Sequence, residues 1–354
     1  MSSRRKNEVS GRVHTVLGPI ESSDLGVTVA HEHLLLDITC YTVQAEHATG
    51  RALRDSPVQI DMLGDLPSRF LYSLENMRLL DERVALQEVL RFRRAGGDSV
   101  VETTSATIGR DPLAYARISR ATGLNVVMGS GYYVSVSHPP DMAERTVDSI
   151  AEEIVRDLTV GVGETGIRSG VIGEVGCSFP LHPDERKSLV ASGIAQRETG
   201  APVTLHTGGP REAKCEILDA LLEGGANPRK VIFGHSDGYL DPDDLRALAE
   251  VGCYIQLDVF GWEDTSIERI LPGFRFTNDA ERLQSIANIA EMGYIDHVLV
   301  AQDICQPWQY VCMGGKGYAH HLESIVPRMR RLGFADEDLR RIFVDNPARA
   351  LAFE

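Results

Sequence analysis

The chain has 354 residues, 43% of them hydrophobic and 25% charged, so it can bury a sizeable core. Its formal net charge of −15 argues against nucleic acid or an anionic membrane surface as partner, because both attract basic proteins. No apolar run approaches membrane length, and the six cysteines form no Cys-x-x-Cys pair, which favours a reduced, cytoplasmic protein. We therefore expect a small-molecule substrate, and a homodimer stays open.

The N-terminal part of the chain predicts a tail, a hairpin and a long connection. Residues 1–10 are polar and predict a loose tail, followed by one domain over residues 11–354. The turn signal Gly18-Pro19 predicts a small hairpin in residues 11–20. In the connection, about residues 38–76, Ser56-Pro57 predicts a short helix with the serine as its N-cap.

The stretch Val29 to Asp37, VAHEHLLLD, predicts the first β-strand of the domain. Side chains alternate between the faces of a strand, so His31 and His33 lie on one face and Glu32 on the other. Two neutral imidazoles on one face are a ready pair of ligands for a zinc-like ion. Two ordinary polar residues at a strand end are the competing interpretation.

From residue 81 onward, helices alternate with short strands rich in Val, Ile and Leu. Such continuous apolar strands predict a parallel sheet buried on both faces. The expected strands after the first are 99–103, 125–128, 170–174, 202–206, 230–235, 253–258 and 297–303. The expected helices begin near 81, 111, 143, 183, 212, 241 and 279, with two more near 320–332 and 336–350.

This alternation predicts a (β/α)₈ TIM barrel, an α/β fold, with an N-terminal hairpin and extra C-terminal helices. An open doubly wound sheet is the competing fold. Against it, no Gly-x-Gly-x-x-Gly motif follows the first strand, and polar residues end most strands rather than cluster at one switch point.

The polar residues at the strand ends predict a metal site. Catalytic residues of such barrels lie at the C-terminal ends of the strands. The residues expected there are the two histidines of the first strand and one residue from each of strands four, five, six and eight: His31, His33, Glu174, His206, His235 and Asp303. Any one of them alone could be a satisfied buried polar group, but six together favour a metal-dependent active site.

Several motifs in register make the chain similar to the phosphotriesterase-related proteins, the phosphotriesterase-like group of the amidohydrolase superfamily. The resemblance covers nearly the whole chain. The matching stretches are GRVHTVLGPI at 11–20, AHEHL at 30–34, IGRD at 108–111, GSGYY at 129–133, GEVG at 173–176 and GKGY at 315–318.

The resemblance implies a binuclear metal centre. His31, His33 and Asp303 would hold a buried ion, His206 and His235 a more exposed one, and a hydroxide would bridge the pair. Many members have a carbamylated lysine as a further bridge, where this chain has Glu174. The expected cofactors are two divalent ions, zinc first, with Mn²⁺, Co²⁺ or Fe²⁺ as alternatives.

The implied function is hydrolysis, with the bridging hydroxide as nucleophile and Asp303 as catalytic proton acceptor. A lactone or carboxylic ester is the favoured substrate, and an N-acyl amino acid amide or a phosphotriester is the alternative. A non-catalytic metal-binding barrel is the alternative of another class. Tyr133 and Arg275 are weaker candidates for substrate binding. The competing interpretation is ordinary packing for Tyr133 and a solvated loop arginine for Arg275.

Overall fold

Eight parallel strands form a barrel in the computed structural model, which describes residues 10–64, 66–207, 209–263 and 277–354. One sheet has the order β12-β11-β10-β9-β8 and the other the order β3-β6-β7. Two contacts join these sheets. A β-bridge between Ser130 and Gly173 joins the end of β7 to β8, and the backbone N–H of Gln302, just after β12, donates to the Glu32 carboxylate on β3. The strands are Thr28–Glu32 (β3), Ser99–Glu102 (β6), Asn125–Met128 (β7), Ile172–Cys177 (β8), Val203–Thr207 (β9), Val231–Phe233 (β10), Tyr254–Leu257 (β11) and Val298–Val300 (β12).

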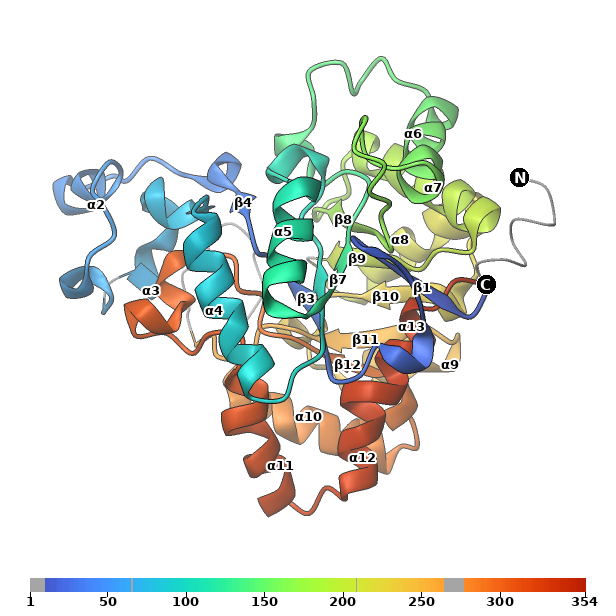
Figure 1. Cartoon of the computed structure of the whole chain (residues 1–354). Helices are drawn as coiled ribbons and strands as arrows, with labels where there is room; N and C mark the ends of the chain where they lie inside the picture. Colours follow the sequence, from blue (N-terminus) through green and yellow to red (C-terminus); the bar gives the residue numbers. More distant parts are fainter. Residues whose placement is uncertain (1–9, 65, 208, 264–276) are drawn as a thin grey trace.

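A helix follows each of the first seven barrel strands, and these helices surround the barrel (Figure 1). Their starts agree with the capping residues in the sequence: Asp81, Asp111 and Asn278 each accept hydrogen bonds from the first turn of the helix that follows. The helices are Glu82–Arg94 (α4), Pro112–Thr122 (α5), Val147–Thr159 (α6), Pro183–Thr199 (α7), Arg211–Glu223 (α8), Pro242–Glu250 (α9) and Asp279–Glu291 (α10). The (β/α)₈ prediction is confirmed.

The sequence predicts two helices after β12, and the structure has three shorter α-helices there. They are Val326–Arg331 (α11), Asp336–Arg340 (α12) and Asn346–Leu351 (α13). A π-helical turn precedes α11 and another joins α12 to α13. No helix in the described part of the chain is both long and apolar enough to cross a membrane.

The long connection between β3 and β6 contains a two-stranded antiparallel pair and two short helices. The strands are Leu36–Asp37 (β4) and Arg78–Leu79 (β5), and the helices are Ala48–Leu53 (α2) and Leu66–Arg69 (α3). Figure 1 shows α2 and α3 at one side of the barrel. The predicted helix at Ser56-Pro57 is wrong: the Ser56 hydroxyl bonds back to the carbonyl of Ala52 at the end of α2 instead of capping a new helix.

Alternate residues of the barrel strands face opposite sides. A group of buried side chains from five strands lies with residues near both ends of the described chain: Ala30, Val101, Val127, Ile232 and Leu299 with Val13 and Leu351. Their neighbours Val100, Val126, Val231 and Val298 belong to two other buried clusters. Apolar side chains therefore fill one end of the barrel interior, and its polar residues are left for the other end.

The predicted hairpin is present as Arg12–Thr15 (β1) and Gly18–Glu21 (β2). It is tied to the C-terminus, because Gly11 N–H donates to the Phe353 carbonyl and Phe353 N–H donates to the Arg12 carbonyl. Residues 1–9 of the predicted tail lie outside the described residues, and the single-domain organisation stays a prediction.

Candidate metal centre

The six predicted metal-type residues come from five strands and meet at one end of the barrel. His31, Glu174 and His206 lie within β3, β8 and β9, whereas the other three follow the ends of their strands. One detail of the sequence prediction is wrong, since Glu174 does not end its strand. β8 continues to Cys177, because Gly176 and Cys177 still pair with β9.

Glu174 lies between two pairs of histidines. Its Oε1 is 3.3 Å from His33 Nε2, and its Oε2 is 3.2 Å from His31 Nε2 and 3.0 Å from His206 Nδ1. His235 Nε2 is 3.8 Å from the same Oε2. The ligand atoms fall into two groups, each within 4.8 Å of one another: His31, His33 and Glu174, and Glu174, His206 and His235. Glu174 is common to both, as a bridging carboxylate would be.

Asp303 joins the first of these groups. Its Oδ1 is 3.3 Å from His33 Nε2 and 3.9 Å from His31 Nε2. The second group is nearer the solvent, since the His206 side chain is 18% exposed against 0% for His31. This arrangement fits one buried and one more accessible ion.

The buried polar atoms of this cluster form a donor set that fits a cation. Both ring nitrogens of His31 are buried without a hydrogen-bond partner among the described residues, although buried polar atoms are nearly always satisfied. Burial opposes the ionisation of Glu174, but His31 and His206 outweigh it and lower its pKa well below the ordinary value. An ionised carboxylate beside an unsatisfied imidazole is a donor set that suits a divalent metal ion.

Asp258, which the sequence analysis did not single out, holds two of these histidines. It is fully buried; its Oδ1 is 2.8 Å from His235 Nδ1 and its Oδ2 is 3.4 Å from His31 Nδ1. A carboxylate on the far nitrogen of a ligand histidine fixes the tautomer and directs Nε2 toward the metal. The available signal was its place as the last residue of a predicted strand, the same place that identified the ligands.

His33 is oriented by a second group that sequence reasoning missed. Thr104 Oγ1 lies 2.8 Å from His33 Nδ1 and donates to Glu102 Oε1 at 2.6 Å. If His33 Nδ1 donates to this hydroxyl, its Nε2 is left free toward Glu174 and Asp303. Burial raises the pKa of Glu102 to about 7. The signal was again a polar residue at a strand end, since Glu102 ends β6.

Two of the predicted ligands have an uncommon backbone conformation. His235 and Asp303 are non-glycine residues with φ values of 53° and 51°. This left-handed region costs about 1–3 kcal/mol of conformational free energy per residue, so it persists only where surrounding contacts offset that cost. At His235 the compensation is visible, because its N–H donates to both oxygens of Asp258 at 3.0 Å.

Tyr133, one of the two weaker candidates, lies beside His206. Its buried hydroxyl is 3.1 Å from His206 Nε2, and the Tyr41 hydroxyl lies 3.5 Å from the same nitrogen. The two tyrosine rings meet edge to face, with centroids 5.9 Å apart. A contact of Tyr133 with substrate stays a prediction. Arg275, the other weaker candidate, lies outside the described residues.

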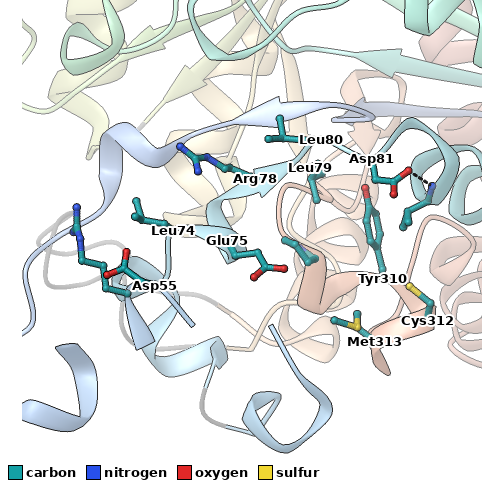
Figure 2. Close-up of a pocket in the computed structure, with 13 residues that line it drawn as sticks. Asp55, Leu74, Glu75, Arg78, Leu79, Leu80, Asp81, Tyr310, Cys312 and Met313 are labelled. Carbon is teal, nitrogen blue, oxygen red and sulfur yellow. Dashed lines mark hydrogen bonds between the residues drawn. The ribbon is translucent and has the colours of Figure 1, made fainter. Parts of the chain in front are cut away.

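A separate cavity of about 630 Å³ lies away from the predicted ligands (Figure 2). It is lined by residues of the β3–β6 connection and α4, among them Arg78 and Glu75, and by Tyr310 and Met313 from the segment after β12. None of the six metal-type residues lines it. It is therefore not the candidate metal centre.

A (β/α)₈ barrel with paired histidines around a shared carboxylate defines a metal-dependent hydrolase with a binuclear-type site. Residues 11–351 match the Phosphotriesterase family, and the chain belongs to this family. This confirms the resemblance found in the sequence and decides against a non-catalytic barrel.

The similarity to known proteins covers nearly the whole chain. The N-acetyltaurine hydrolase of Tetraodon nigroviridis is 35% identical, covering 98% of this chain and 100% of its own length. The crystal structure of a resiniferatoxin-binding protein from Rhodobacter sphaeroides has a TM-score of 0.92 and 36% identity, covering 96% of this chain and 95% of that one. A lactonase from Listeria monocytogenes has a TM-score of 0.77 at 23% identity, covering 97% and 99%, which is a likeness of fold alone.

Proposed function

We propose that the protein hydrolyses the amide bond of a small N-acyl compound at a binuclear metal centre. His31, His33 and Asp303 would hold one divalent ion, His206 and His235 would hold the other, and Glu174, which is common to both groups, would be shared between them. The observation that supports this best is the place of Glu174, whose two oxygens lie 3.0–3.3 Å from three histidines of the two groups. Zinc is the first candidate, because imidazole and carboxylate donors suit it.

Two bound divalent ions would supply a nucleophile, by lowering the pKa of bound water to about 7, and would polarise the acyl oxygen. The chain's own groups then handle the proton. The Asp303 side chain is 12% exposed, against 2% for Glu174, so it is the carboxylate that water and substrate reach more easily. Asp303 takes the proton from the attacking water and returns it to the leaving amine, which departs poorly unless protonated.

The substrate class rests on the relatives. N-acetyltaurine hydrolases at 33–35% identity match this chain over 96–98% of its length, whereas the lactonase is similar in fold only. An N-acylated amine that bears an anionic group is therefore the first substrate to test. Ester or lactone hydrolysis, the favoured expectation from the sequence, stays a prediction. The same metals and base could hydrolyse an amide bond or an ester bond.

The test is a substrate panel with metal-loaded protein. N-acetyltaurine, N-acetyl amino acids, simple lactones and a phosphotriester are supplied in turn, and amine or proton release is measured. We expect amine release from an N-acetyl compound as the fastest reaction. The Glu174→Gln variant, purified identically, controls for contaminating hydrolases. Turnover of lactones or phosphotriesters without any amine release would overturn the amide assignment.

A further inference from the structure

Glu32 lies between the two histidines of the first strand but serves another part of the site. It is fully buried, and the hydrogen bonds of its carboxylate lead to the segment after β12. Its Oε1 accepts the Gln302 N–H at 2.8 Å, and its Oε2 accepts the Ile304 N–H at 2.8 Å. Gln302 and Ile304 flank Asp303, so one carboxylate brackets the backbone of this predicted ligand from both sides.

The bracketed residue is one that needs support. Asp303 has a φ of 51°, a conformation that non-glycine residues rarely adopt. Its carbonyl is held too, because Gln309 Nε2 donates to it at 3.0 Å, while Gln309 Oε1 accepts the N–H groups of Cys305 and Gln306. The backbone around Asp303 is thus fixed by two side chains, and Glu32 is the one that comes from the neighbouring barrel strand, β3.

The chemistry requires a carboxylate at this position. Two N–H donors converge, and only a group with two acceptor oxygens satisfies both. Glu32 is fully buried, and burying a carboxyl group without hydrogen-bond partners is costly, so packing alone would favour an apolar side chain here. A glutamine offers one oxygen and one nitrogen, so its nitrogen would face one of the two N–H donors.

We propose that Glu32 is a positioning residue that sets the place of the Asp303 carboxylate by fixing the peptide groups on either side of it. It touches no reacting atom and acts through Asp303. The inference rests on the proposed function in one respect, the role of Asp303 as ligand and proton acceptor. Ion retention and turnover should therefore both depend on Glu32.

The chain contains a matched control. Glu88 on α4 is also buried, and it accepts the N–H groups of Val311 and Cys312 at 2.8 and 3.1 Å. Glu32 and Glu88 therefore both accept hydrogen bonds from the backbone of the segment after β12. The contacts of Glu88 are at Val311 and Cys312, eight and nine residues beyond Asp303. Glu88→Gln removes the same kind of contact without reaching the metal-type residues.

The experiment compares Glu32→Gln, Glu32→Asp and Glu88→Gln as zinc-loaded proteins. Zinc loss to a chromophoric chelator, the melting temperature, kcat and KM are measured on each. For Glu32→Gln we expect about 10–100-fold weaker zinc retention, as for other residues that orient metal ligands. We expect kcat to fall at least about tenfold, with KM changed less. Glu88→Gln should lose a similar amount of thermal stability but retain zinc and kcat, and Glu32→Asp should recover part of both.

Each outcome decides the proposal. Equal zinc loss and equal kcat in the two glutamine variants would overturn it, because Glu32 would then be only a structural residue. If Glu32→Gln does not fold, Glu32→Asp decides: wild-type zinc retention and kcat in that folded variant would also overturn it. A wild-type protein that retains zinc but cleaves no acyl amide overturns the proposed function alone, since the zinc-release comparison still tests Glu32.

Discussion

Asp258 Oδ1 and His235 Nδ1 form a buried hydrogen bond of 2.8 Å, and the other oxygen of the same carboxylate lies 3.4 Å from His31 Nδ1. His31 and His235 belong to different ligand groups. A single side chain behind the site therefore contacts one imidazole of each group, and the orientations of the two groups are linked through it.

Replacing the Asp258 carboxylate should lower the affinity for both metal ions together. In Asp258→Asn the amide has a single oxygen and cannot turn a negatively charged oxygen toward each imidazole, so we expect about 10–100-fold lower metal affinity at both positions. Metal analysis after dialysis against graded chelator concentrations measures it. Asp243→Asn, on the outer face of α9 with a side chain 70% exposed, is the control. Retention of two ions with wild-type affinity would remove Asp258 from this role.

Glu174→Gln should lose both metal and activity. The wild-type protein is expected to hold close to two divalent ions per chain, and a neutral amide bridges two cations poorly. We expect metal content to drop to one ion or fewer and most turnover to disappear. Glu185→Gln is a matched control: Glu185 is equally buried and accepts N–H groups of Ser135 and Ser178, without contacting a metal-type histidine. Normal content and turnover in Glu174→Gln would show that it is not the bridge.

Asp303→Asn separates coordination from proton transfer. The amide keeps one coordinating oxygen but is no base, and a general base contributes about 10²–10⁴-fold to rate. We expect a turnover loss of at least that order, with metal content reduced less than in Glu174→Gln. Rates and metal content are measured on the same preparation. A fully metallated variant that loses less than about tenfold would leave Asp303 as a ligand only.

Rebuilding the site should need metal but no bicarbonate. A carbamylated lysine forms from carbon dioxide, whereas the carboxylate of Glu174 is part of the chain. Lys230 precedes β10, and its Nζ donates to the carbonyls of Arg349 and Ala352, away from the ligands. Apoprotein given zinc in degassed buffer should recover full activity. Recovery only after bicarbonate is added would contradict the assignment of Glu174.

Asp279 should make the fold sensitive to acid. Burial alone would raise its pKa, but His320, the Gly261 N–H and Arg282 outweigh burial and lower the pKa well below the ordinary value. A carboxylate with a lowered folded pKa stabilises the protein above its unfolded pKa of about 3.9, and this contribution disappears as the pH falls further.

The variant Asp279→Asn tests this. Breaking such a buried pair costs about 3–5 kcal/mol, and we expect that loss near pH 7. Below pH 4 the difference from wild type should shrink, which urea unfolding at several pH values measures. Asp336→Asn, with a side chain 84% exposed, should change little at any pH. A pH-independent difference would mean that the effect is one of packing.

The six metal-type residues could be singled out from the sequence because each lies in an apolar strand or just after one, as His235 lies just after β10. The residues behind them could not. Asp258 and Glu102 also lie at strand ends. Only the closed barrel shows which of these side chains points into the candidate metal centre and which lies behind its histidines. The prediction of a helix at Ser56 was wrong for a local reason, because a serine hydroxyl can either cap a new helix or hydrogen-bond to the preceding one.

The connection between Glu32 and Gln302 spans 270 residues of chain, and it joins the first and eighth strands of the barrel. During synthesis the first histidine pair leaves the ribosome long before Asp303 does. A nascent chain therefore cannot assemble the complete ligand set, and a chain truncated before β12 would contain four histidines without their second carboxylate. The predicted ligand set is thus complete only after β12 has joined β3, so a full set of metal-type side chains would require the whole barrel to have closed.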